Sequence, residues 1–324
     1  MPSNRQTQSY LIRRFQEAGI RPDVRHGQNF LIDLNLLDLL LETADPGPRD
    51  VVLEVGTGMG SLTRGMAQRA AAVVTVEIDA RMFQLASEEL DDYENVVMLH
   101  QDALKNKNNL HPAVLEAVRA KMGEHPGSQF KLAANLPYNI ATPILSNLLT
   151  VDPLPVSLTA TIQKELADRI SASPGTKDYS ALSIWMQAQC DTRVVRVMPP
   201  SVFWPRPRVH SAIVQIVPNA EKRARIGNLA FFHHFVRSLF LHRRKFLRGV
   251  LVNMVKEQID KQSVDELLAA FQFPADARAE QQSVETLIAL AAAVEDLAST
   301  PSESKAWAHH ALCGLGRGGG IAAG

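Results

Sequence analysis

Short apolar runs recur along the first two thirds of the chain, and helix-favouring stretches lie between them. Such alternation is typical of a doubly wound α/β sheet, in which each run forms a buried parallel strand. Five runs show this spacing: VVLEV at 51–55, VVTVE at 73–77, VVML at 96–99, FKLAAN at 130–135 and SLTATIQ at 157–163. The pattern therefore predicts five parallel strands with helices packed against them.

The pattern changes twice after the fifth run. Two β-rich runs, 192–198 and 211–217, have no helix-length segment between them, so we expect an antiparallel pair that completes a seven-stranded sheet. Beyond Pro218 the chain favours helix at 229–256, 263–271 and 281–297. We predict three parts: an α/β domain at 1–218, a small helical domain at 219–298, and a disordered glycine-rich tail at 299–324.

Composition narrows the class of protein. With 46% hydrophobic residues the chain can form a packed core. No stretch reaches the roughly 18 apolar residues of a membrane-spanning helix, and the N-terminus lacks a secretory apolar region, so we expect a cytoplasmic protein that binds no membrane. Cys190 and Cys313 are isolated, which favours neither a disulfide framework nor a zinc site. We predict no metal and, as the default, a monomer.

The charges are unevenly distributed, although the formal net charge is zero. Between 193 and 250 there are twelve lysines and arginines and a single acid, Glu221. A local excess of this size favours contact with nucleic-acid phosphates, although some arginines could serve only to solubilise a helix surface.

A glycine-rich turn follows the first strand. In Leu53-Glu54-Val55-Gly56-Thr57-Gly58-Met59-Gly60 the chain leaves a strand and enters a helix. Glycine allows the backbone to turn tightly and to approach a ligand closely. By itself this turn could bind a dinucleotide or S-adenosylmethionine, or could be purely structural.

Two acids follow the next two strands. Glu77 ends VVTVE, about 20 residues beyond the glycines, where a carboxylate can accept hydrogen bonds from both hydroxyls of a ribose. Asp102 follows VVML, where it could accept a hydrogen bond from an adenine amine. Glycines, Glu77 and Asp102 at successive strand ends together predict a site for an adenosyl cofactor, with Gly56 and Gly58 in the loop.

The fourth strand ends in Asn135-Leu136-Pro137-Tyr138, the most specific short motif in the chain. The amine of adenine is a poor nucleophile because its lone pair is delocalised into the ring. The side-chain oxygen of Asn135 and the carbonyl of Leu136 can accept its two hydrogens and localise that lone pair. Pro137 fixes the direction of the carbonyl, and Tyr138 offers a stacking face for a base taken out of its helix.

With these motifs the sequence strongly resembles the KsgA-type ribosomal RNA adenine N6,N6-dimethyltransferases over about residues 20–295. Two further segments match that family: GQNFLID at 27–33 and FWPRPRVHSA at 203–212. The resemblance implies a class I, Rossmann-like methyltransferase fold with a small helical C-terminal domain. It also implies that Asn29 and Leu31 contact S-adenosylmethionine, together with Gly56, Glu77, Asp102 and Asn135, and that Phe203 stacks with or encloses the target adenine opposite Tyr138.

The resemblance is incomplete in the second of these segments. The family usually has lysine and then aspartate where this chain has Arg208 and His210, which puts details of RNA contact in doubt. We nevertheless expect cationic residues to bind RNA phosphates, because A-form helices hide the base edges of their major groove. The candidates are Arg206, Arg208, Arg243, Arg244, Lys245 and Arg248.

The resemblance implies transfer of four methyl groups, two to each of two adjacent adenosines near the 3′ end of small-subunit rRNA, with a role in assembly of the small subunit. Two alternatives stay open. One is the related Erm-type dimethylase, which acts on large-subunit rRNA. The other is a non-catalytic relative that binds nucleic acid, which would have no need of Asn135, Tyr138, Glu77 and Gly56.

Overall fold

The computed structural model describes residues 7–19, 28–241 and 245–299. Contacts group the chain into two compact units. The first, which we call the sheet unit, comprises Met1–Ser171 and Gln189–Arg223, and the second, the helical unit, comprises Ala172–Ala188 and Ala224–Gly324. The predicted division at Pro218 stays a prediction, and the predicted tail lies outside the described residues apart from Ser299.

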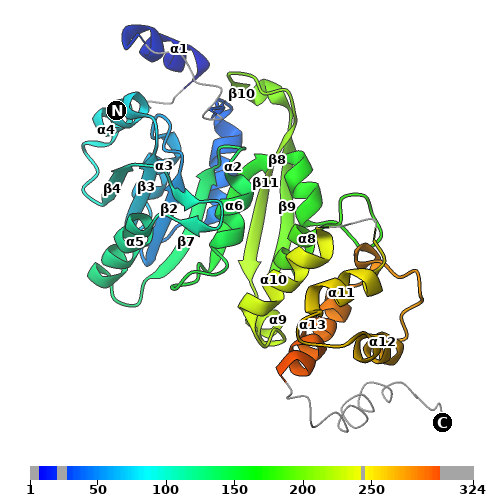
Figure 1. Ribbon diagram of the computed structural model, residues 1–324. Helices are drawn as coiled ribbons and strands as arrows, with labels where there is room; N and C mark the ends of the chain where they lie inside the picture. Colours follow the sequence, from blue (N-terminus) through cyan, green and yellow to red (C-terminus); the bar gives the residue numbers. More distant parts are fainter. Residues whose placement is uncertain (1–6, 20–27, 242–244, 300–324) are drawn as a thin grey trace, which may run out of the picture. The chain divides into compact units, whose positions relative to one another are not determined.

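A seven-stranded sheet forms the centre of the sheet unit (Figure 1). Its order is β4-β3-β2-β7-β8-β11-β9, with neighbours hydrogen-bonded. The strands are β2 (Asp50–Val55), β3 (Ala72–Glu77), β4 (Val96–His100), β7 (Gln129–Asn135), β8 (Ser157–Gln163), β9 (Cys190–Met198) and β11 (Ser211–Pro218).

The pairing of the strands confirms the predicted topology. The strands β2, β3, β4, β7 and β8 are mutually parallel, so their carboxyl ends share one edge of the sheet. β11 runs antiparallel to both β8 and β9. Because Ser211 is paired with Gln163, the last residue of β8, β11 begins at the same edge at which the parallel strands end. We call this the carboxyl edge.

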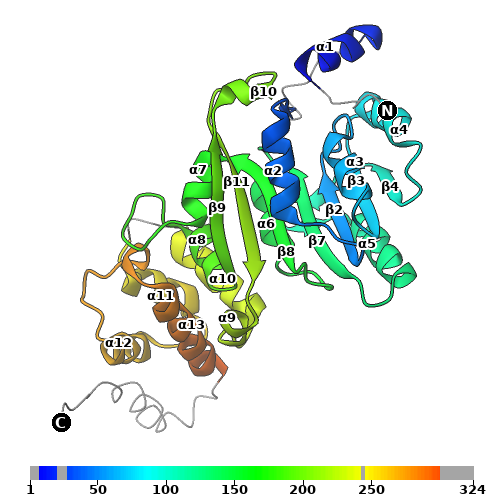
Figure 2. The ribbon, with the colours of Figure 1, turned by 180° about the vertical axis from the view of Figure 1, so that it is seen from behind.

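Helices cover both faces of this sheet, which explains why β2 and β3 are mainly apolar and fully buried. The helices α2 (Leu34–Ala44) and α3 (Ser61–Ala67) lie in front of the sheet in Figure 2. Residues of both helices share a core cluster with Val52 and Ala133. The other helices of this part are α1 (Gln8–Glu17), α4 (Ala80–Leu90), α5 (Pro112–Glu124), α6 (Ala141–Asn147) and α7 (Lys164–Ile170).

Two small sheets lie outside the central one. β1 (Phe30–Leu31) is antiparallel to β10 (Phe203–Trp204), with Leu31 opposite Phe203. β5 (Leu104–Asn106) is paired with β6 (Asn109–Leu110). The first pairing joins the two segments, GQNFLID and FWPRPRVHSA, that carried part of the family resemblance, although about 170 residues separate them in the sequence.

The helical unit contains α8 (Ala181–Gln187), α10 (Leu229–Phe240), α11 (Leu247–Val255), α12 (Lys261–Ala270) and α13 (Val284–Ser299), with α9 (Ala220–Ala224) leading into it. Buried apolar residues such as Phe232, Phe235 and Leu287 fill its interior. The stretch 229–256, which we expected to favour helix throughout, contains two helices: α10 ends at Phe240, and Phe246 is extended (φ −66°, ψ 147°) before α11 begins. In the residues described, no helix is long and apolar enough to cross a membrane.

Candidate active site

The glycine loop joins the carboxyl end of β2 to α3. Gly56 and Gly58 have φ values of 89° and 57°, in the left-handed region that other residues rarely adopt. A Cβ on Gly56 would lie 3.2 Å from Cδ of Pro137, and one on Gly58 would lie 3.2 Å from the ring of Phe30. A side chain at either glycine would therefore crowd its neighbour and strain the backbone, and Gly56 lies directly against the Asn-Leu-Pro-Tyr segment.

Glu77, at the end of β3, is a buried acid, 6% exposed. Its Oε2 accepts the N–H of Gly58 (3.1 Å), and its Oε1 accepts the N–H of Asp79 (3.0 Å). Burial raises the pKa of this carboxyl group, although the backbone donors oppose the shift. Asp102, which follows β4, is exposed, and its side chain accepts the N–H of Leu104 (2.8 Å).

Asn135 is the last residue of β7 and is oriented by the segment before β1. Its Nδ2 donates to the carbonyl of Asn29 at 2.8 Å. No donor among the described residues contacts its side-chain oxygen, which stays available as an acceptor. The next peptide is fixed as well, because the N–H of Leu136 donates to the carbonyl of Thr161 on β8 (3.2 Å).

Tyr138 is held at its far end. Its hydroxyl lies 2.6 Å from Oγ of Ser211, the first residue of β11. Burial raises the pKa of the phenol, and the hydrogen bond to Ser211 opposes this shift, so the hydroxyl is protonated at neutral pH.

One cavity at the carboxyl edge brings these groups together. It is lined by residues from the glycine loop, the ends of β3, β4 and β7, and the segment around β1. Ten of the predicted site residues line it: Asn29, Leu31, Gly56, Gly58, Glu77, Asp102, Asn135, Leu136, Pro137 and Tyr138.

Phe203 does not line this cavity. Its ring is 2% exposed and belongs to a core cluster with Leu31, Met198 and Ile213. The pairing of β10 with β1 turns it inward, so in this structure the ring presents no face to a ligand. The expectation that Phe203 stacks with or encloses the target adenine opposite Tyr138 stays a prediction.

Glu54 lines the cavity, and the sequence analysis did not single it out. It lies within β2 and is 1% exposed. Its Oε2 accepts hydrogen bonds from the hydroxyls of Thr63 (2.5 Å) and Thr75 (2.7 Å). The available signal was an acid between apolar residues directly before the glycines, a position where burial of a charge is costly.

Burial raises the pKa of Glu54 to about 8, from an ordinary value of 4.5, whereas the two threonine hydroxyls lower it. The folded protein therefore holds this proton more tightly than the unfolded chain does. The corresponding contribution to the free energy of unfolding is fully present below about pH 4.5 and is lost as the pH rises through about 8.

We expect Glu54→Gln to remove this pH dependence, because glutamine keeps an acceptor for both threonines and cannot ionise. Between pH 6 and 8 the free energy of unfolding of the unaltered protein should fall relative to that of the variant by about 1 kcal/mol per pH unit. Urea denaturation at several pH values measures this difference, and the contribution of Glu77 is largely common to both proteins. Parallel pH profiles would show that Glu54 is ionised in the fold.

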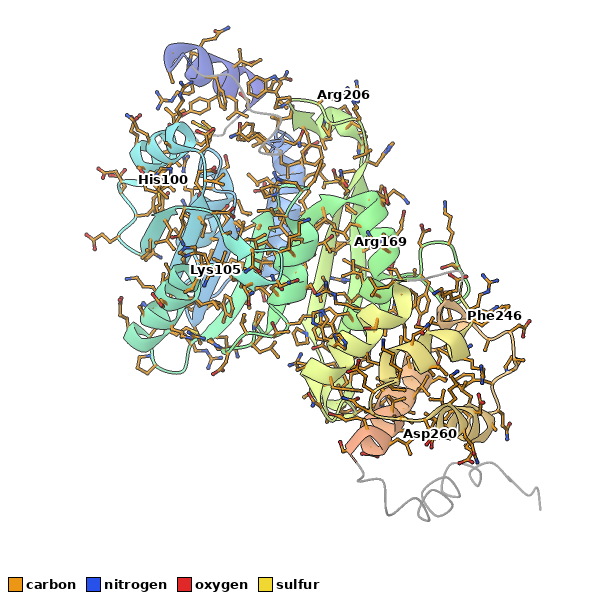
Figure 3. The ribbon with its side chains drawn as sticks, viewed as in Figure 1. His100, Lys105, Arg169, Arg206, Phe246 and Asp260 are labelled. Atoms are coloured by element: carbon orange, nitrogen blue, oxygen red, sulfur yellow. The ribbon has the colours of Figure 1, made fainter. Side chains whose placement is uncertain are left out.

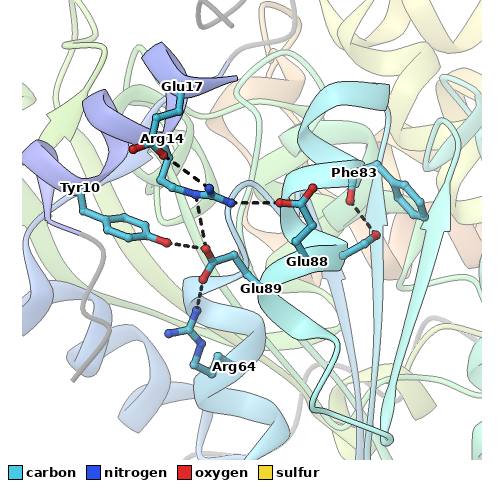
Figure 4. A network of polar contacts seen from close by, with 8 residues as sticks. Tyr10, Arg14, Glu17, Arg64, Phe83, Glu88 and Glu89 are labelled. Atoms are coloured by element: carbon cyan, nitrogen blue, oxygen red, sulfur yellow. Dashed lines mark hydrogen bonds and ion pairs between the residues drawn. The ribbon is translucent and has the colours of Figure 1, made fainter. Parts of the chain in front are cut away.

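The helix α1 contributes Leu11 to the cavity lining. Phe15 of the same helix contacts the rings of Phe30 and Trp204 edge to face, with centroids 5.4 Å and 5.2 Å away. Polar contacts hold the helix in place (Figure 4): Glu89 of α4 accepts from Tyr10 and pairs with Arg14, and it also pairs with Arg64 of α3. The helix α1 precedes every motif in the predicted site, and nothing in the sequence indicated that it would line the cavity.

The cationic residues predicted to bind RNA differ in their surroundings. Arg206 and Arg208 are exposed between β10 and β11, near the start of β11 at the carboxyl edge, and have no ion pair among the described residues. Figure 3 labels Arg206 in this segment. In the helical unit, Lys245 is exposed, whereas Arg248 forms a two-point ion pair with Asp265 (2.6 Å and 2.8 Å). Arg243 and Arg244 lie outside the described residues. No group of three potential metal ligands occurs in the described part.

Comparison with known proteins decides the family. The model of the ribosomal RNA adenine dimethylase family matches residues 21–290. The chain belongs to this family. The resemblance inferred from the motifs is thus confirmed, and α1 precedes the matched region.

Similar proteins include two named ribosomal RNA small subunit methyltransferase A. The one from Clostridium botulinum (strain ATCC 19397 / Type A) is 36% identical over 271 residues, covering 84% of this chain and 93% of the relative. The one from Alkaliphilus oremlandii is 38% identical over 260 residues, covering 80% and 87%.

Solved structures agree with this membership. A dimethyladenosine transferase from Plasmodium falciparum superposes with a TM-score of 0.68 at 24% identity, covering 82% of this chain and 97% of that one, and shows the fold. The 23S rRNA methyltransferase ErmE superposes with a TM-score of 0.58 at 25% identity, covering 82% and 100%. The predicted Rossmann-like methyltransferase sheet with a helical C-terminal region is confirmed, and the protein is an rRNA methyltransferase.

Proposed function

We propose that this protein dimethylates the N6 amines of two adjacent adenosines near the 3′ end of small-subunit (16S) rRNA, with S-adenosylmethionine as methyl donor. The observation that carries the proposal is the orientation of Asn135. Its amide nitrogen is bound to Asn29, which leaves the side-chain oxygen available in a cavity that the glycine loop and Glu77 also line. The oxygen proposed to accept the adenine amine and the residues proposed to bind the adenosyl group therefore line the same cavity.

The cavity fits an adenosyl cofactor. Close packing at Gly56 and Gly58 allows backbone approach without side chains, as a ligand beside a strand-to-helix turn requires. The carboxylate of Glu77 accepts two backbone N–H groups and has further lone pairs for ribose hydroxyls. Asp102 could accept the adenine amine, and Asn29 and Leu31 are placed to contact the rest of the cofactor. We propose that no metal takes part.

The chain's own contribution to the chemistry is to prepare the amine. When bound, S-adenosylmethionine supplies a methyl group on a sulfonium, a good leaving group. The side-chain oxygen of Asn135 and the carbonyl of Leu136 accept the two amine hydrogens, which localises the lone pair on nitrogen. The nitrogen then forms a bond to the methyl carbon as the carbon–sulfur bond breaks, and its proton leaves to water. Positioning carries this reaction, so no side chain is needed as a strong base.

Tyr138 provides the contact with the base itself. Its ring lines the cavity beside Asn135, which is the position for stacking on an adenine removed from its helix. In the described conformation Phe203 is buried, so the proposal assigns the stacking face to Tyr138, and Phe203 would have to leave the core to enclose the base from the other side.

The small subunit is favoured over the large one by the degree of similarity. Relatives at 36% and 38% identity bear the name small subunit methyltransferase A, whereas the ErmE structure, named for 23S rRNA, is 25% identical. A non-catalytic role alone is disfavoured, because the cavity retains every group needed for transfer. We further propose that the protein acts in the cytoplasm as a monomer and contributes to assembly of the small subunit.

The direct test is methyl transfer from labelled S-adenosylmethionine to small subunits that lack these methyl groups, followed by mapping of the modified base. Large subunits and duplex DNA serve as controls. Dimethyladenosine at two adjacent positions in small-subunit rRNA is the expected product. Label confined to large subunits would favour the Erm-type activity, and tight subunit binding without label would favour a non-catalytic role.

We propose that Arg206 and Arg208 bind phosphates of the rRNA, with Lys245 and the neighbouring Arg243 and Arg244 as further contacts. Arg196 on β9, which the sequence analysis did not include, is also exposed and has no ion pair among the described residues. The pairing of Arg248 with Asp265 reduces the charge that Arg248 offers to RNA.

The double variant Arg206→Ala with Arg208→Ala should bind small subunits about 10-fold more weakly at 150 mM salt. Because each phosphate contact releases counterions, the slope of log affinity against log salt should fall by about two. Filter binding from 50 to 200 mM salt measures both quantities.

The matched control is Arg49→Ala with Arg69→Ala: both residues are exposed near the opposite edge of the sheet, before β2 and β3 respectively. An equal loss in this control would mean that general charge, rather than a local contact, determines binding.

A further inference from the structure

The hydroxyl of Ser211 is fixed in space. Ser211 is fully buried and begins β11, which lies between β8 and β9 in the sheet. Its Cα partners are Gln163 on one neighbouring strand and Met198 on the other. A residue held by two strands moves little, so its side chain is a rigid anchor for any group that contacts it.

The group in contact is the hydroxyl of Tyr138, 2.6 Å away. The backbone around Tyr138 is itself restrained: the N–H of Leu136 donates to Thr161 (3.2 Å), and the N–H of Ile140 donates to the carbonyl of Pro137 (3.1 Å). The remaining freedom of the ring is rotation about its own side-chain bonds. A hydrogen bond at the far end of the ring removes that freedom.

Two buried hydroxyls on the neighbouring strand β8 are not paired in this way. Thr159 and Thr161 on β8 are also fully buried, yet their hydroxyls have no hydrogen-bond partner in the part of the chain that the structure describes. The pairing of Ser211 with Tyr138 is therefore a feature of this site rather than a general property of hydroxyls at this edge.

We infer that Ser211 is a positioning residue that holds the ring of Tyr138 in the orientation that receives the target adenine. This inference rests on the proposed function, in which Tyr138 packs against the base. A ring that is already oriented does not have to be ordered when the base arrives, which lowers the cost of forming the reactive arrangement. The effect should appear in the rate of transfer rather than in binding of the cofactor.

The test compares Ser211→Ala, Tyr138→Phe and the double variant, because each removes the same hydrogen bond. Single-turnover methyl transfer is measured at saturating S-adenosylmethionine and small subunits, and cofactor affinity is measured by calorimetry. A neutral hydrogen bond corresponds to a rate change of about 2- to 10-fold. We expect both single variants to slow transfer by this factor, the double variant to be no slower than either, and the affinity for S-adenosylmethionine to stay unchanged.

Thr159→Val is the matched control, since it removes a fully buried hydroxyl that has no hydrogen-bond partner among the described residues, and it should leave the rate unchanged. Tyr138→Phe keeps the inference testable if Ser211→Ala does not fold. Rate losses that multiply in the double variant, or a matching loss of cofactor affinity, would overturn the inference. Tyr138→Ala distinguishes a failure of this inference from a failure of the proposed function. If Tyr138→Ala slows transfer strongly while Ser211→Ala and Tyr138→Phe do not, only the role of Ser211 is wrong. Full activity in Tyr138→Ala contradicts the proposed role of the ring itself.

Discussion

Replacing Asn135 with alanine should slow methyl transfer by about 100- to 1,000-fold, the loss found when one pre-positioned hydrogen-bonding group is removed from a reacting centre. The side-chain oxygen is available for the amine because the nitrogen of the same amide is bound to Asn29. Without that oxygen, the carbonyl of Leu136 is left as the single acceptor, and the lone pair of the amine stays delocalised. The measurement is the rate of transfer to unmethylated small subunits in a single turnover.

Binding measurements show whether the effect is chemical. Affinity for small subunits should be unchanged in Asn135→Ala, because the exposed cations that we propose to bind phosphates lie elsewhere. An effect on assembly of the subunit that persists in this variant would separate binding from catalysis. Asn35→Ala, which removes an exposed amide from α2 outside the cavity lining, is the matched control. Transfer at an undiminished rate in Asn135→Ala would contradict the proposed mechanism.

The features that the sequence predicted well are those set by local pattern. Continuous apolar runs indicate strands covered on both faces, and β2 and β3 are buried along their whole lengths. Residues that follow parallel strands must meet at one edge of the sheet, so Gly56, Glu77 and Asn135 could be placed together before any coordinates were known. Topology converts positions that are distant in the sequence into neighbours.

Features that depend on packing between distant segments could not be predicted from the sequence. Nothing local shows that Phe203 turns inward, because this follows from the pairing of β10 with β1. Arg248 forms an ion pair with Asp265 on the next helix, 17 residues along the chain. Without knowledge of this ion pair, the charge that Arg248 offers to RNA could not be judged. The contribution of α1 to the cavity depends on its contacts with Glu89, which no sequence motif marks.

Two buried acids, Glu54 and Glu77, lie on adjacent strands and line the same cavity. Their burial is unfavourable for the stability of the fold. Burial raises the pKa of both carboxyl groups, and the nearby Glu77 raises the pKa of Glu54 further. Such a cost is typical of a site that acts on a ligand. The hydrogen bonds to Thr63, Thr75 and the glycine loop reduce the cost in the absence of a ligand.

Replacing Glu77 with alanine should weaken binding of S-adenosylmethionine by about 100- to 10,000-fold. Two hydrogen bonds from ribose hydroxyls to a buried carboxylate contribute roughly 1.5–3 kcal/mol each, and the loop also loses the acceptor for the N–H of Gly58. Calorimetry measures the affinity, and Glu116→Ala, which removes an exposed acid on α5, is the control.

A cofactor analogue with a 2′-deoxyribose distinguishes loss of the ribose contact from loss of support for the glycine loop. It should bind the unaltered protein more weakly than S-adenosylmethionine, but it should bind Glu77→Ala equally well, because the acceptor of that hydroxyl is already gone. If the analogue is disfavoured to the same extent in both proteins, Glu77 supports the glycine loop and does not contact the ribose.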